Sequence, residues 1–284
     1  MLLIDLNQVM ISNLMMQVGS SSKVKLDEGL VRHMVLNTIR MNVKTFRSYG
    51  KVVIACDNKK YWRREFFPNY KAGRKKMRES SVHDWNLIFE CLNKIKQELK
   101  DFSPYMVLDV DRAEADDVIA VLASEFARKE KIMILSNDKD FIQLQKNSNV
   151  EQYSPILKKK IHSDEKSAVL QLKEMIIRGD SSDGVPNILS QDDVFLAEGK
   201  KQGSITKKKL EQWLYQTPET FCNDEMMRNY SRNQLMIDFD FIPSEIKADI
   251  LHKFEETKPA SKQIFLNYMI KNRLNNLMEV FDDF

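Results

Sequence analysis

Four short apolar runs in this chain each lead into acidic residues, and this pattern restricts the fold more than any other feature. The most informative run covers residues 131–136 and continues into Asp138 and Asp140. Patterns with helical spacing lie between the runs, and such alternation indicates βαβ units and a parallel sheet. The strand-like runs cover residues 1–5, 51–57, 105–110 and 131–136, and a shorter fifth run lies near 150–154.

Helical patterns separate these runs and dominate the second half of the chain. They cover about 27–49, 84–101 and 113–129, and beyond residue 165 they recur at 167–178, 206–215, 224–236, 244–256 and 261–280. We therefore predict an α/β fold, with a central, mostly parallel sheet flanked by helices and a C-terminal helical subdomain. The predicted units are residues 1–165 and 166–284, with a basic hairpin or loop near 155–166.

The acidic residues fall at or just beyond the carboxyl ends of the predicted strands. Ligands of parallel sheets bind in the crevice outside those ends, so we expect the carboxylates to converge there. One such acid is usually a helix cap or a turn residue, but capping does not explain acids at four strand ends. Crowded carboxylates repel one another, which predicts bound cations, most simply a pair of Mg²⁺ ions. The candidate ligands are Asp5, Asp57, Glu114, Asp116, Asp138 and Asp140, with Asp117 either among them or behind them.

A second acidic motif follows the helical pattern that ends at Arg178. Gly179 is its expected C-cap, and Asp180 and Asp183 come directly afterwards. Acids three residues apart share one face of a turn. Both can therefore approach the cations from the side opposite the strand ends.

The segment after Asp57 is strongly basic. Between Lys59 and Arg78 there are nine Lys or Arg residues and one acid, Glu65, with aromatic residues interleaved. Such a run is often only a solvated face, but cations that neutralise phosphates and aromatics that stack on bases suit a single strand of nucleic acid. Because like charges repel, we expect residues 59–80 to be mobile in the free protein and to become helical on binding.

Composition excludes several classes of protein. With 43% apolar and 30% charged residues and a net charge of +3, the chain has the composition of an ordinary soluble globular protein. The three cysteines lie far apart, which favours neither disulfides nor a zinc site and indicates a reducing cytoplasm. No apolar stretch is long enough for a membrane span, and Asp5 interrupts the first apolar run, so we expect a buried strand there and no signal peptide. Phosphate-binding and dinucleotide-binding glycine motifs are absent from the sequence.

The order of the motifs resembles the flap endonuclease, or 5′-nuclease, family, and the resemblance extends over essentially the whole chain. Residues 61–64, 154–155 and 237–243 further resemble a T-even bacteriophage branch of that family that acts as ribonuclease H. The motifs that carry the family resemblance are Tyr70-Lys71-x-x-Arg74, Glu114-Ala115-Asp116-Asp117, Asp138-x-Asp140 and Gly179-Asp180-x-x-Asp183, with Asp5 and Asp57 after the first two strands.

The resemblance implies a PIN-like 5′-nuclease core with a basic helical arch at residues 58–83, and a helical subdomain with a duplex-binding, helix-turn-helix-like region. It implies two Mg²⁺ ions, with Mn²⁺ able to substitute, and places Lys71 and Arg74 in catalysis at the foot of the arch. The implied first-metal group is Asp5, Asp57, Glu114, Asp116 and Asp138, and the second is Asp140, Asp180 and Asp183; the resemblance leaves open to which group Asp117 belongs. The implied nucleic-acid contacts are Arg63, Arg64, Tyr70, Lys75, Lys76, Lys207, Lys208 and Lys209.

The implied activity is that of a Mg²⁺-dependent 5′-to-3′ exonuclease, flap endonuclease and ribonuclease H. Such an enzyme removes RNA primers and 5′ flaps during lagging-strand replication. The implied substrates are DNA and RNA–DNA hybrids with a 5′ single-stranded flap, and the implied replication partners are a single-strand-binding protein and a sliding clamp. We further expect a monomer in the cytoplasm of a phage-infected bacterial host, without membrane association.

One segment departs from the family pattern. Where the family has a glycine-rich turn that grips duplex DNA and often K⁺, this chain has residues 187–193, so K⁺ binding is doubtful, although lysines at 200–201 and 207–209 supply charge. Two other functions fit the sequence less well. A haloacid-dehalogenase-type phosphatase needs a second Asp two residues after the first-strand Asp, and that position is Asn7. A DNA-binding protein that has lost catalysis is not favoured, because the acidic set looks complete.

Overall fold

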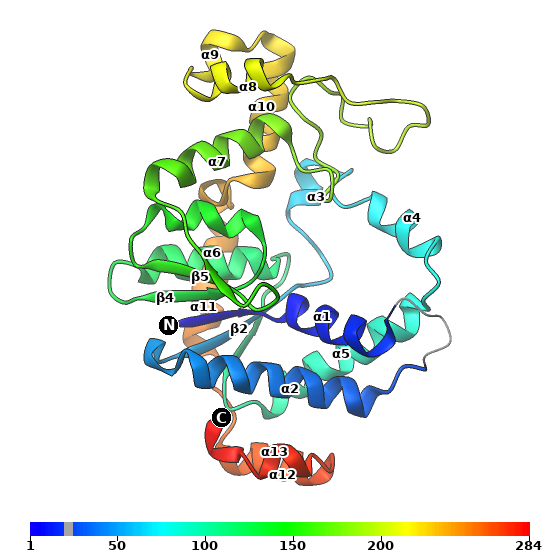
Figure 1. Cartoon of the computed structure of the whole chain (residues 1–284), viewed down its shortest axis with the longest axis vertical. Coiled ribbons are helices and arrows are strands. Elements are labelled where there is room, and N and C mark those ends of the chain that lie inside the picture. Colours follow the sequence, from blue (N-terminus) through cyan, green and yellow to red (C-terminus); the bar gives the residue numbers. More distant parts are fainter. Residues whose placement is uncertain (20–24) are drawn as a thin grey trace.

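A single sheet of six strands organises the molecule, which a computed structural model describes over residues 1–19 and 25–284 (Figure 1). The strand order is β3-β2-β1-β4-β5-β6, with β1 to β5 parallel and β6 antiparallel to β5. The five expected strands are therefore confirmed, and the basic link between the two halves is the β5–β6 hairpin. The strands are β1 (Leu2–Asp5), β2 (Val52–Cys56), β3 (Met106–Asp109), β4 (Ile132–Leu135), β5 (Val150–Ser154) and β6 (Lys159–Ile161).

Several helices of the first half begin where an acidic side chain accepts backbone N–H groups. Asp27 and Asp84 cap α2 and α5 in this way, because their carboxylates replace missing intrahelical acceptors. The long helix expected at 27–49 ends earlier and continues as a 3₁₀ turn after Phe46. The helices are α1 (Leu6–Val18), α2 (Glu28–Thr45), η1 (Arg47–Tyr49), α3 (Arg63–Phe66), α4 (Gly73–Glu79), α5 (Trp85–Phe102), α6 (Ala115–Phe126) and η2 (Lys139–Lys146).

The second half is helical, as expected, with one correction. The helix expected at 261–280 is two helices, because Arg273 adopts a left-handed backbone (φ 55°) and the buried Leu274 turns the chain back on itself. The elements are α7 (Glu165–Arg178), α8 (Lys207–Leu214), α9 (Pro218–Phe221), α10 (Asp224–Ile237), η3 (Phe239–Phe241), α11 (Ser244–Glu256), α12 (Lys262–Lys271), α13 (Asn275–Met278) and η4 (Phe281–Asp283).

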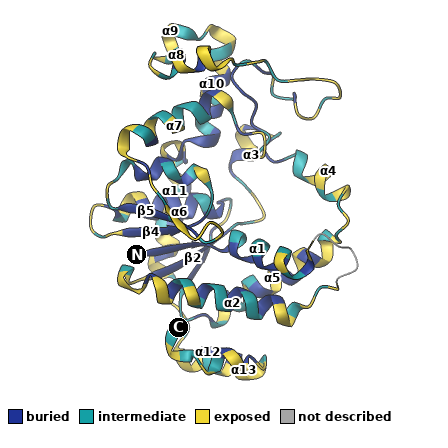
Figure 2. Cartoon of the chain, in the orientation of Figure 1, coloured by how far each residue is buried: buried dark blue, intermediate teal, exposed yellow. Residues whose placement is uncertain are grey.

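Both faces of the sheet are buried, as Figure 2 shows for its strands. Leu3 of β1 packs with α6 and α11 on one face, whereas Leu2 and Ile4 pack with α1, α2, α5 and α12 on the other. This division arises because successive side chains of a strand point to opposite faces of the sheet. A third apolar cluster joins α7, α8 and α10. The helical half therefore completes both cores of the sheet and also builds a core of its own.

No helix in the described part of the chain is both long enough and apolar enough to span a bilayer.

We predict that Gly179→Ala destabilises the protein more than Gly50→Ala. Both glycines have positive φ, at 66° and 78°, so both changes carry a backbone cost of about 1–3 kcal/mol. A Cβ on Gly179 would also lie 2.3 Å from the Val185 carbonyl oxygen, whereas a Cβ on Gly50 meets no atom within 4 Å. This clash adds about 1–3 kcal/mol. Denaturant unfolding of the two variants measures the difference, and equal losses would contradict the packing shown for the turn.

Candidate active site

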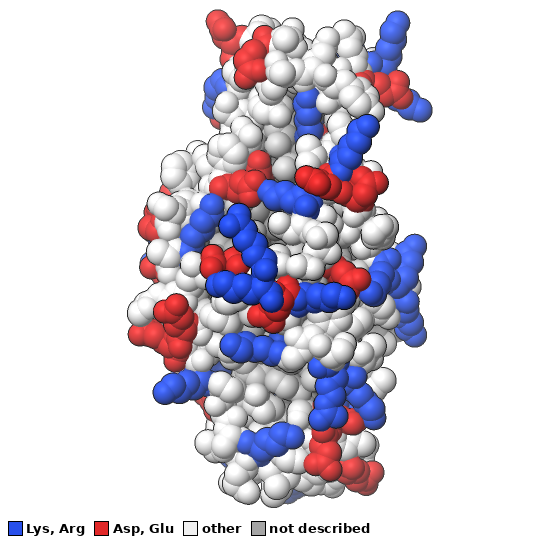
Figure 3. All heavy atoms as spheres, turned by 90° about the vertical axis from the view of Figure 1, so that its left-hand side faces the viewer, with Lys and Arg blue, Asp and Glu red and all other residues white. Residues whose placement is uncertain are grey.

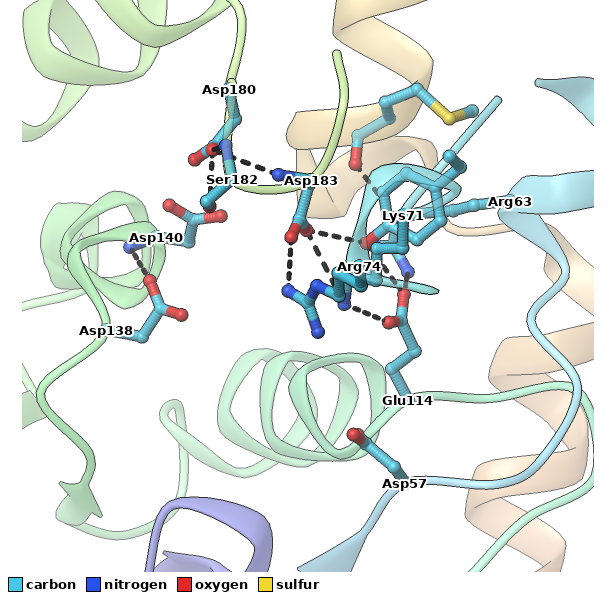
Figure 4. A network of polar contacts seen from close by, with 12 residues as sticks. Asp57, Arg63, Lys71, Arg74, Glu114, Asp138, Asp140, Asp180, Ser182 and Asp183 are labelled. Atoms are coloured by element: carbon cyan, nitrogen blue, oxygen red, sulfur yellow. Dashed lines mark hydrogen bonds and ion pairs between the residues drawn. The ribbon is translucent and has the colours of Figure 1, made fainter. Parts of the chain in front are cut away.

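The sheet order brings the acids of the first half to one edge. Because β1 lies between β2 and β4, Asp5, Asp57 and Asp138 follow neighbouring parallel strands. Asp116 lies in the first turn of α6, and Asp140 lies in η2, directly after Asp138. Figure 4 shows Asp57, Asp138 and Asp140 around the same space. The convergence expected from the strand ends is therefore present.

Several of these carboxylates also cap local structure. Asp5 accepts the Gln8 N–H at 3.0 Å and starts α1, and Asp138 accepts the Asp140 N–H at 3.0 Å and starts η2. Asp57 accepts the Ala115 N–H at 2.8 Å, which fixes the start of α6 beside β2. Capping and convergence thus occur together, because the caps hold the carboxylates at the edge of the sheet.

The turn after α7 supplies the opposite side of the site. Asp180 pairs with Val185 in an isolated β-bridge, and its carboxylate accepts the Ser182 N–H at 2.8 Å and hydroxyl at 2.6 Å. Asp183 accepts from Arg74 at 2.5 Å, and its backbone carbonyl accepts the Lys71 N–H at 2.7 Å. The turn is therefore bound directly to the foot of the basic segment (Figure 4).

Negative charge exceeds positive charge in this site. Lys71 pairs with Glu114, Arg74 with Asp183 and Lys139 with Asp180. The remaining carboxylates have no ion-pair partner within the described residues, and they are Asp5, Asp57, Asp116, Asp138 and Asp140.

Burial, together with the charges of neighbouring carboxylates, raises the pKa values of Asp5, Asp57, Asp116 and Asp140. Burial, with the nearby charges of Asp57 and Asp138, raises the pKa of Asp5 to about 7. Burial, followed by the charge of Asp138, raises the pKa values of Asp116 and Asp140 well above their ordinary range. One carboxylate oxygen of Asp140, Oδ1, is buried without a hydrogen-bond donor. Each of these observations indicates that the site lacks positive charge.

The donor set fits hard divalent cations. Within residues 1–19 and 25–284, no three Asp, Glu, His or Cys side chains are already arranged to hold a metal ion. The unpaired carboxylates Asp5, Asp57, Asp116, Asp138 and Asp140 therefore form an open carboxylate basin and not a complete coordination sphere. Oxygen-only donors, an unpartnered buried oxygen on Asp140 and mutually raised pKa values suit Mg²⁺ or Mn²⁺.

Asp117 has a different place from the one expected for a metal ligand. Its carboxylate is buried, accepts the Glu114 N–H at 2.9 Å and the Trp62 indole N–H at 3.0 Å, and pairs with Arg63. The partners of Asp117 are thus the capping box of α6 and two side chains at the start of α3, Trp62 and Arg63. The structure places it behind the basin, which was the other alternative left open by the sequence.

Two expected nucleic-acid contacts are corrected as well. Arg63 is 3% exposed and pairs with Glu114 and Asp117. Tyr70 is buried, and its hydroxyl lies 3.0 Å from Glu114 Oε2. Both side chains line the cavity of the site, where carboxylates already bind them, and neither is exposed on the outer surface of the segment. The sequence showed a basic, aromatic segment but did not show which of its side chains turn inward.

The basic segment is also better anchored than expected. Trp62 and Phe67 are buried, and the acids of the site neutralise Lys71 and Arg74. These carboxylates offset the charge of Lys71 and Arg74, and the expected mobility of residues 59–80 in the free protein stays a prediction. Helix α4 is already formed in the structure. Of the expected nucleic-acid contacts, those that are exposed are Arg64, Lys75 and Lys76 here, and Lys207, Lys208 and Lys209 on α8.

Some residues of the site were missed from the sequence. Asn7 donates its side-chain amide to Asp57, so both oxygens of that carboxylate are held. Met236, Ile237 and Phe239, near the end of α10, line the cavity that Asp116, Asp140 and Asp183 also line. The position of Asn7, two residues after Asp5, was a signal for its role in the site. No local pattern indicates that a segment more than 200 residues beyond Asn7 closes the site.

Comparison with known proteins identifies the family. Residues 1–174 match the 5′-3′ exonuclease, N-terminal resolvase-like domain. The chain belongs to the 5′-3′ exonuclease family. Residues 166–284 match the C-terminal domain of T4 RNase H, and the chain is 35% identical to the ribonuclease H of Enterobacteria phage T4 over 99% of this chain and 95% of that protein. Both parts of the resemblance seen in the sequence are confirmed.

Other relatives in the family match the first half of the chain. A 5′-3′ exonuclease of Buchnera aphidicola is 31% identical over 51% of this chain and 50% of its own length. A flap endonuclease of Shewanella oneidensis is 37% identical over 45% of this chain and 48% of its own length. Together with the family match, these relatives make the chain a nuclease, an enzyme that hydrolyses nucleic acids.

Solved structures confirm the fold. The 5′-exonuclease of bacteriophage T5 with bound zinc aligns with a TM-score of 0.64 at 16% identity, over 90% of this chain and 98% of that chain. A T5 flap endonuclease in a pseudo-enzyme–product complex with DNA and metal ions aligns with a TM-score of 0.62 at 15% identity, over 90% of this chain and 99% of that chain. The parallel sheet with flanking helices is thus the fold of this nuclease family.

Surface charge outside the site is mixed. Figure 3 shows Lys and Arg side chains crossing one face in a band, with acidic side chains among them. Charge alone does not mark a binding surface on that face. The charge is distributed most unevenly at the site itself, where the carboxylate basin lies beside the basic segment.

We predict that Asp5→Asn stabilises the metal-free protein at about pH 8 but not at about pH 4. The raised pKa of about 7 means that the folded protein holds a proton that the unfolded chain releases near its ordinary pKa of 3.8. The free energy of unfolding therefore falls as the pH rises between these two values. Asparagine at position 5 cannot ionise and so avoids this loss, which is roughly 2–4 kcal/mol.

Melting curves in a chelator at both pH values measure the effect of Asp5→Asn. Asp84→Asn is the matched control, because Asp84 caps an exposed helix start and Asn caps equally well. A destabilised Asp5→Asn protein at the higher pH would contradict the assignment of repulsion to this site.

Proposed function

We propose that this nuclease is a Mg²⁺-dependent 5′-nuclease that cleaves 5′ flaps and the RNA of RNA–DNA hybrids, and removes primers during lagging-strand replication. The observation that carries the proposal is a basin of unpaired carboxylates directly beside Lys71 and Arg74, at the foot of a basic segment. Negative phosphates and acidic side chains come together only where cations lie between them.

The carboxylates fall into two groups that suit two ions. Asp140, Asp180 and Asp183 belong to η2 and the turn after α7, and they form the second group. Bound divalent ions would lower the pKa of a water molecule and offset the charge of the leaving oxygen, with Mn²⁺ able to replace Mg²⁺. The first group comprises Asp5, Asp57, Asp116 and Asp138, with Glu114 beside them.

The chain's own cations complete the site. Lys71 is buried and bound to Glu114, so its ammonium group is fixed beside the basin. Arg74 is 43% exposed in its side chain and reaches Asp183, so it can turn towards a phosphate that enters from solvent. Both side chains would hold the scissile phosphate and stabilise negative charge that develops on it.

Nucleic acid would extend from this point in two directions. Arg64, Lys75 and Lys76 are exposed on the basic segment, which suits a 5′ single strand. Lys207, Lys208 and Lys209 are exposed at the start of α8, which suits the phosphates of a duplex. The names of the relatives, ribonuclease H, 5′-3′ exonuclease and flap endonuclease, support both kinds of substrate.

Potassium is not part of this proposal. The segment that replaces the glycine-rich turn is held by the Asn187 side chain, which accepts the Ser190 hydroxyl at 2.7 Å and donates to the Gly203 carbonyl at 2.7 Å. In this role the enzyme would work as a monomer in the cytoplasm of a phage-infected bacterium, together with a single-strand-binding protein and a sliding clamp.

Asp138→Asn should reduce cleavage roughly 100- to 1,000-fold, because it removes one carboxylate from the basin. Binding to DNA, measured with Ca²⁺ in place of Mg²⁺, should remain similar or become tighter, because repulsion of phosphate decreases. The assay follows single-turnover cleavage of a 5′-labelled flap and of an RNA–DNA hybrid. Asp249→Asn, an exposed change on α11, is the control. Near-normal turnover of Asp138→Asn at saturating Mg²⁺ would contradict the metal assignment.

A further inference from the structure

Arg63 occupies an unusual position for a cation in a basic, nucleic-acid-facing segment. Its side chain is 3% exposed, and its guanidinium lies 4.5 Å from the centre of the Trp62 ring. The neighbouring Arg64 is exposed. Burying an arginine is costly unless its donors are satisfied, so the contacts of Arg63 indicate what it holds in place.

We propose that Arg63 is a positioning residue for the nuclease reaction, which acts through Glu114 to fix the ammonium group of Lys71 at the foot of the basic segment. The inference rests on the proposed function, in which Lys71 meets the reacting phosphate. It replaces the direct nucleic-acid contact that the sequence suggested for Arg63.

The contacts of Arg63 connect three elements. Nε donates to the carbonyl oxygen of Met236 in α10 at 2.9 Å. Nη1 donates to Glu114 Oε2 at 2.9 Å and to Asp117 Oδ2 at 3.0 Å, both at the start of α6. A planar guanidinium makes these contacts in fixed directions, so α3, α6 and the end of α10 are held in one arrangement.

Glu114 transmits this arrangement to Lys71. Its Oε2 atom accepts from Arg63 and lies 3.0 Å from the Tyr70 hydroxyl, and its Oε1 atom accepts from the Lys71 ammonium. Both oxygens are thus engaged by the chain itself. If Glu114 rotated, the Lys71 ammonium would lose its strongest partner. The other carboxylate near it is Asp183, at 3.5 Å.

The charges of this cluster balance. Arg63 and Lys71 face Glu114 and Asp117, and all four side chains are buried. Buried charges interact strongly because water does not screen them. Lysine at position 63 would keep the charge, but a single ammonium group cannot reproduce the directions of the guanidinium. The charge-conserving change Arg63→Lys therefore tests geometry separately from charge.

Arg63→Lys should lower the single-turnover rate on saturating 5′-flap DNA by roughly 10- to 100-fold, because small displacements of a group at the reacting phosphate have effects of that size. The dissociation constant for DNA in Ca²⁺ and its salt dependence should stay unchanged, because Arg63 meets no phosphate. Arg112→Lys is the matched control, since Arg112 makes a bidentate pair with Glu65 on the surface of the same region. It should leave rate and binding unchanged.

A double-mutant cycle tests the route through Lys71. In a Lys71→Ala background, Arg63→Lys should lower the rate by no more than about 2-fold, because the group that it positions is gone. The same fold-loss in both backgrounds would overturn the proposal. So would a weaker binding constant with a smaller salt slope, which is the mark of a direct phosphate contact. A lower melting temperature with an unchanged rate would also overturn it, since Arg63 would then be purely structural.

A measurement without nuclease activity separates this proposal from the proposed function. Acetylation of Lys71, followed by mass spectrometry of the intact folded protein's peptides, should be faster in Arg63→Lys than in the wild type or Arg112→Lys. If Lys71 is acetylated faster in Arg63→Lys but the wild type does not cleave flaps or hybrids, the positioning role holds and the proposed function is wrong. Equal acetylation rates would reject the positioning role. If Arg63→Lys does not fold, Trp62→Phe removes the indole donor to Asp117 and shortens the ring that lies against Arg63, and it should show a smaller effect in the same direction.

Discussion

Repulsion between carboxylates at the carboxyl edge of the sheet is the constraint on which the rest of this structure depends. Parallel strands in the order β2-β1-β4 bring Asp57, Asp5 and Asp138 to adjacent ends, and the helix caps hold these side chains there. The raised pKa values of Asp5 and Asp57 indicate that the fold alone does not neutralise these two carboxylates. The arrangement lowers the stability of the metal-free protein, which is the usual consequence of building a functional site from like charges.

The same repulsion explains why the basic segment and the helical half are packed where they are. Lys71 and Arg74 are anchored by acids from two directions, Glu114 on α6 and Asp183 in the turn after α7. The end of α10 then closes the site through Met236, whose carbonyl oxygen accepts from Arg63. Residues far apart in the sequence are thus held together by a small number of buried ion pairs and hydrogen bonds, which have the directionality that apolar packing lacks.

The sequence predicted the parts of this site that follow from periodicity and direction. Apolar runs define strands, parallel strands end at one edge, and the acids after those runs therefore meet, as Asp57 and Asp138 do. It left the place of Asp117 open and did not predict that Arg63 and Tyr70 turn inward, because a local pattern shows how much charge a segment carries and not which partner each charge finds. The break at Arg273 was missed for a related reason: tertiary packing of Leu274 overrides a helical pattern.

Binding of divalent cations to the metal-free protein tests the central claim most directly. Calorimetric titration with Mg²⁺ or Mn²⁺ at about pH 8, combined with melting curves, measures whether the carboxylate basin takes up cations and what this does to stability. We expect saturable binding of about two ions per chain and a higher melting temperature in their presence. No heat of binding and an unchanged melting temperature would contradict it, because repulsion among Asp5, Asp116 and Asp140 would then remain without relief.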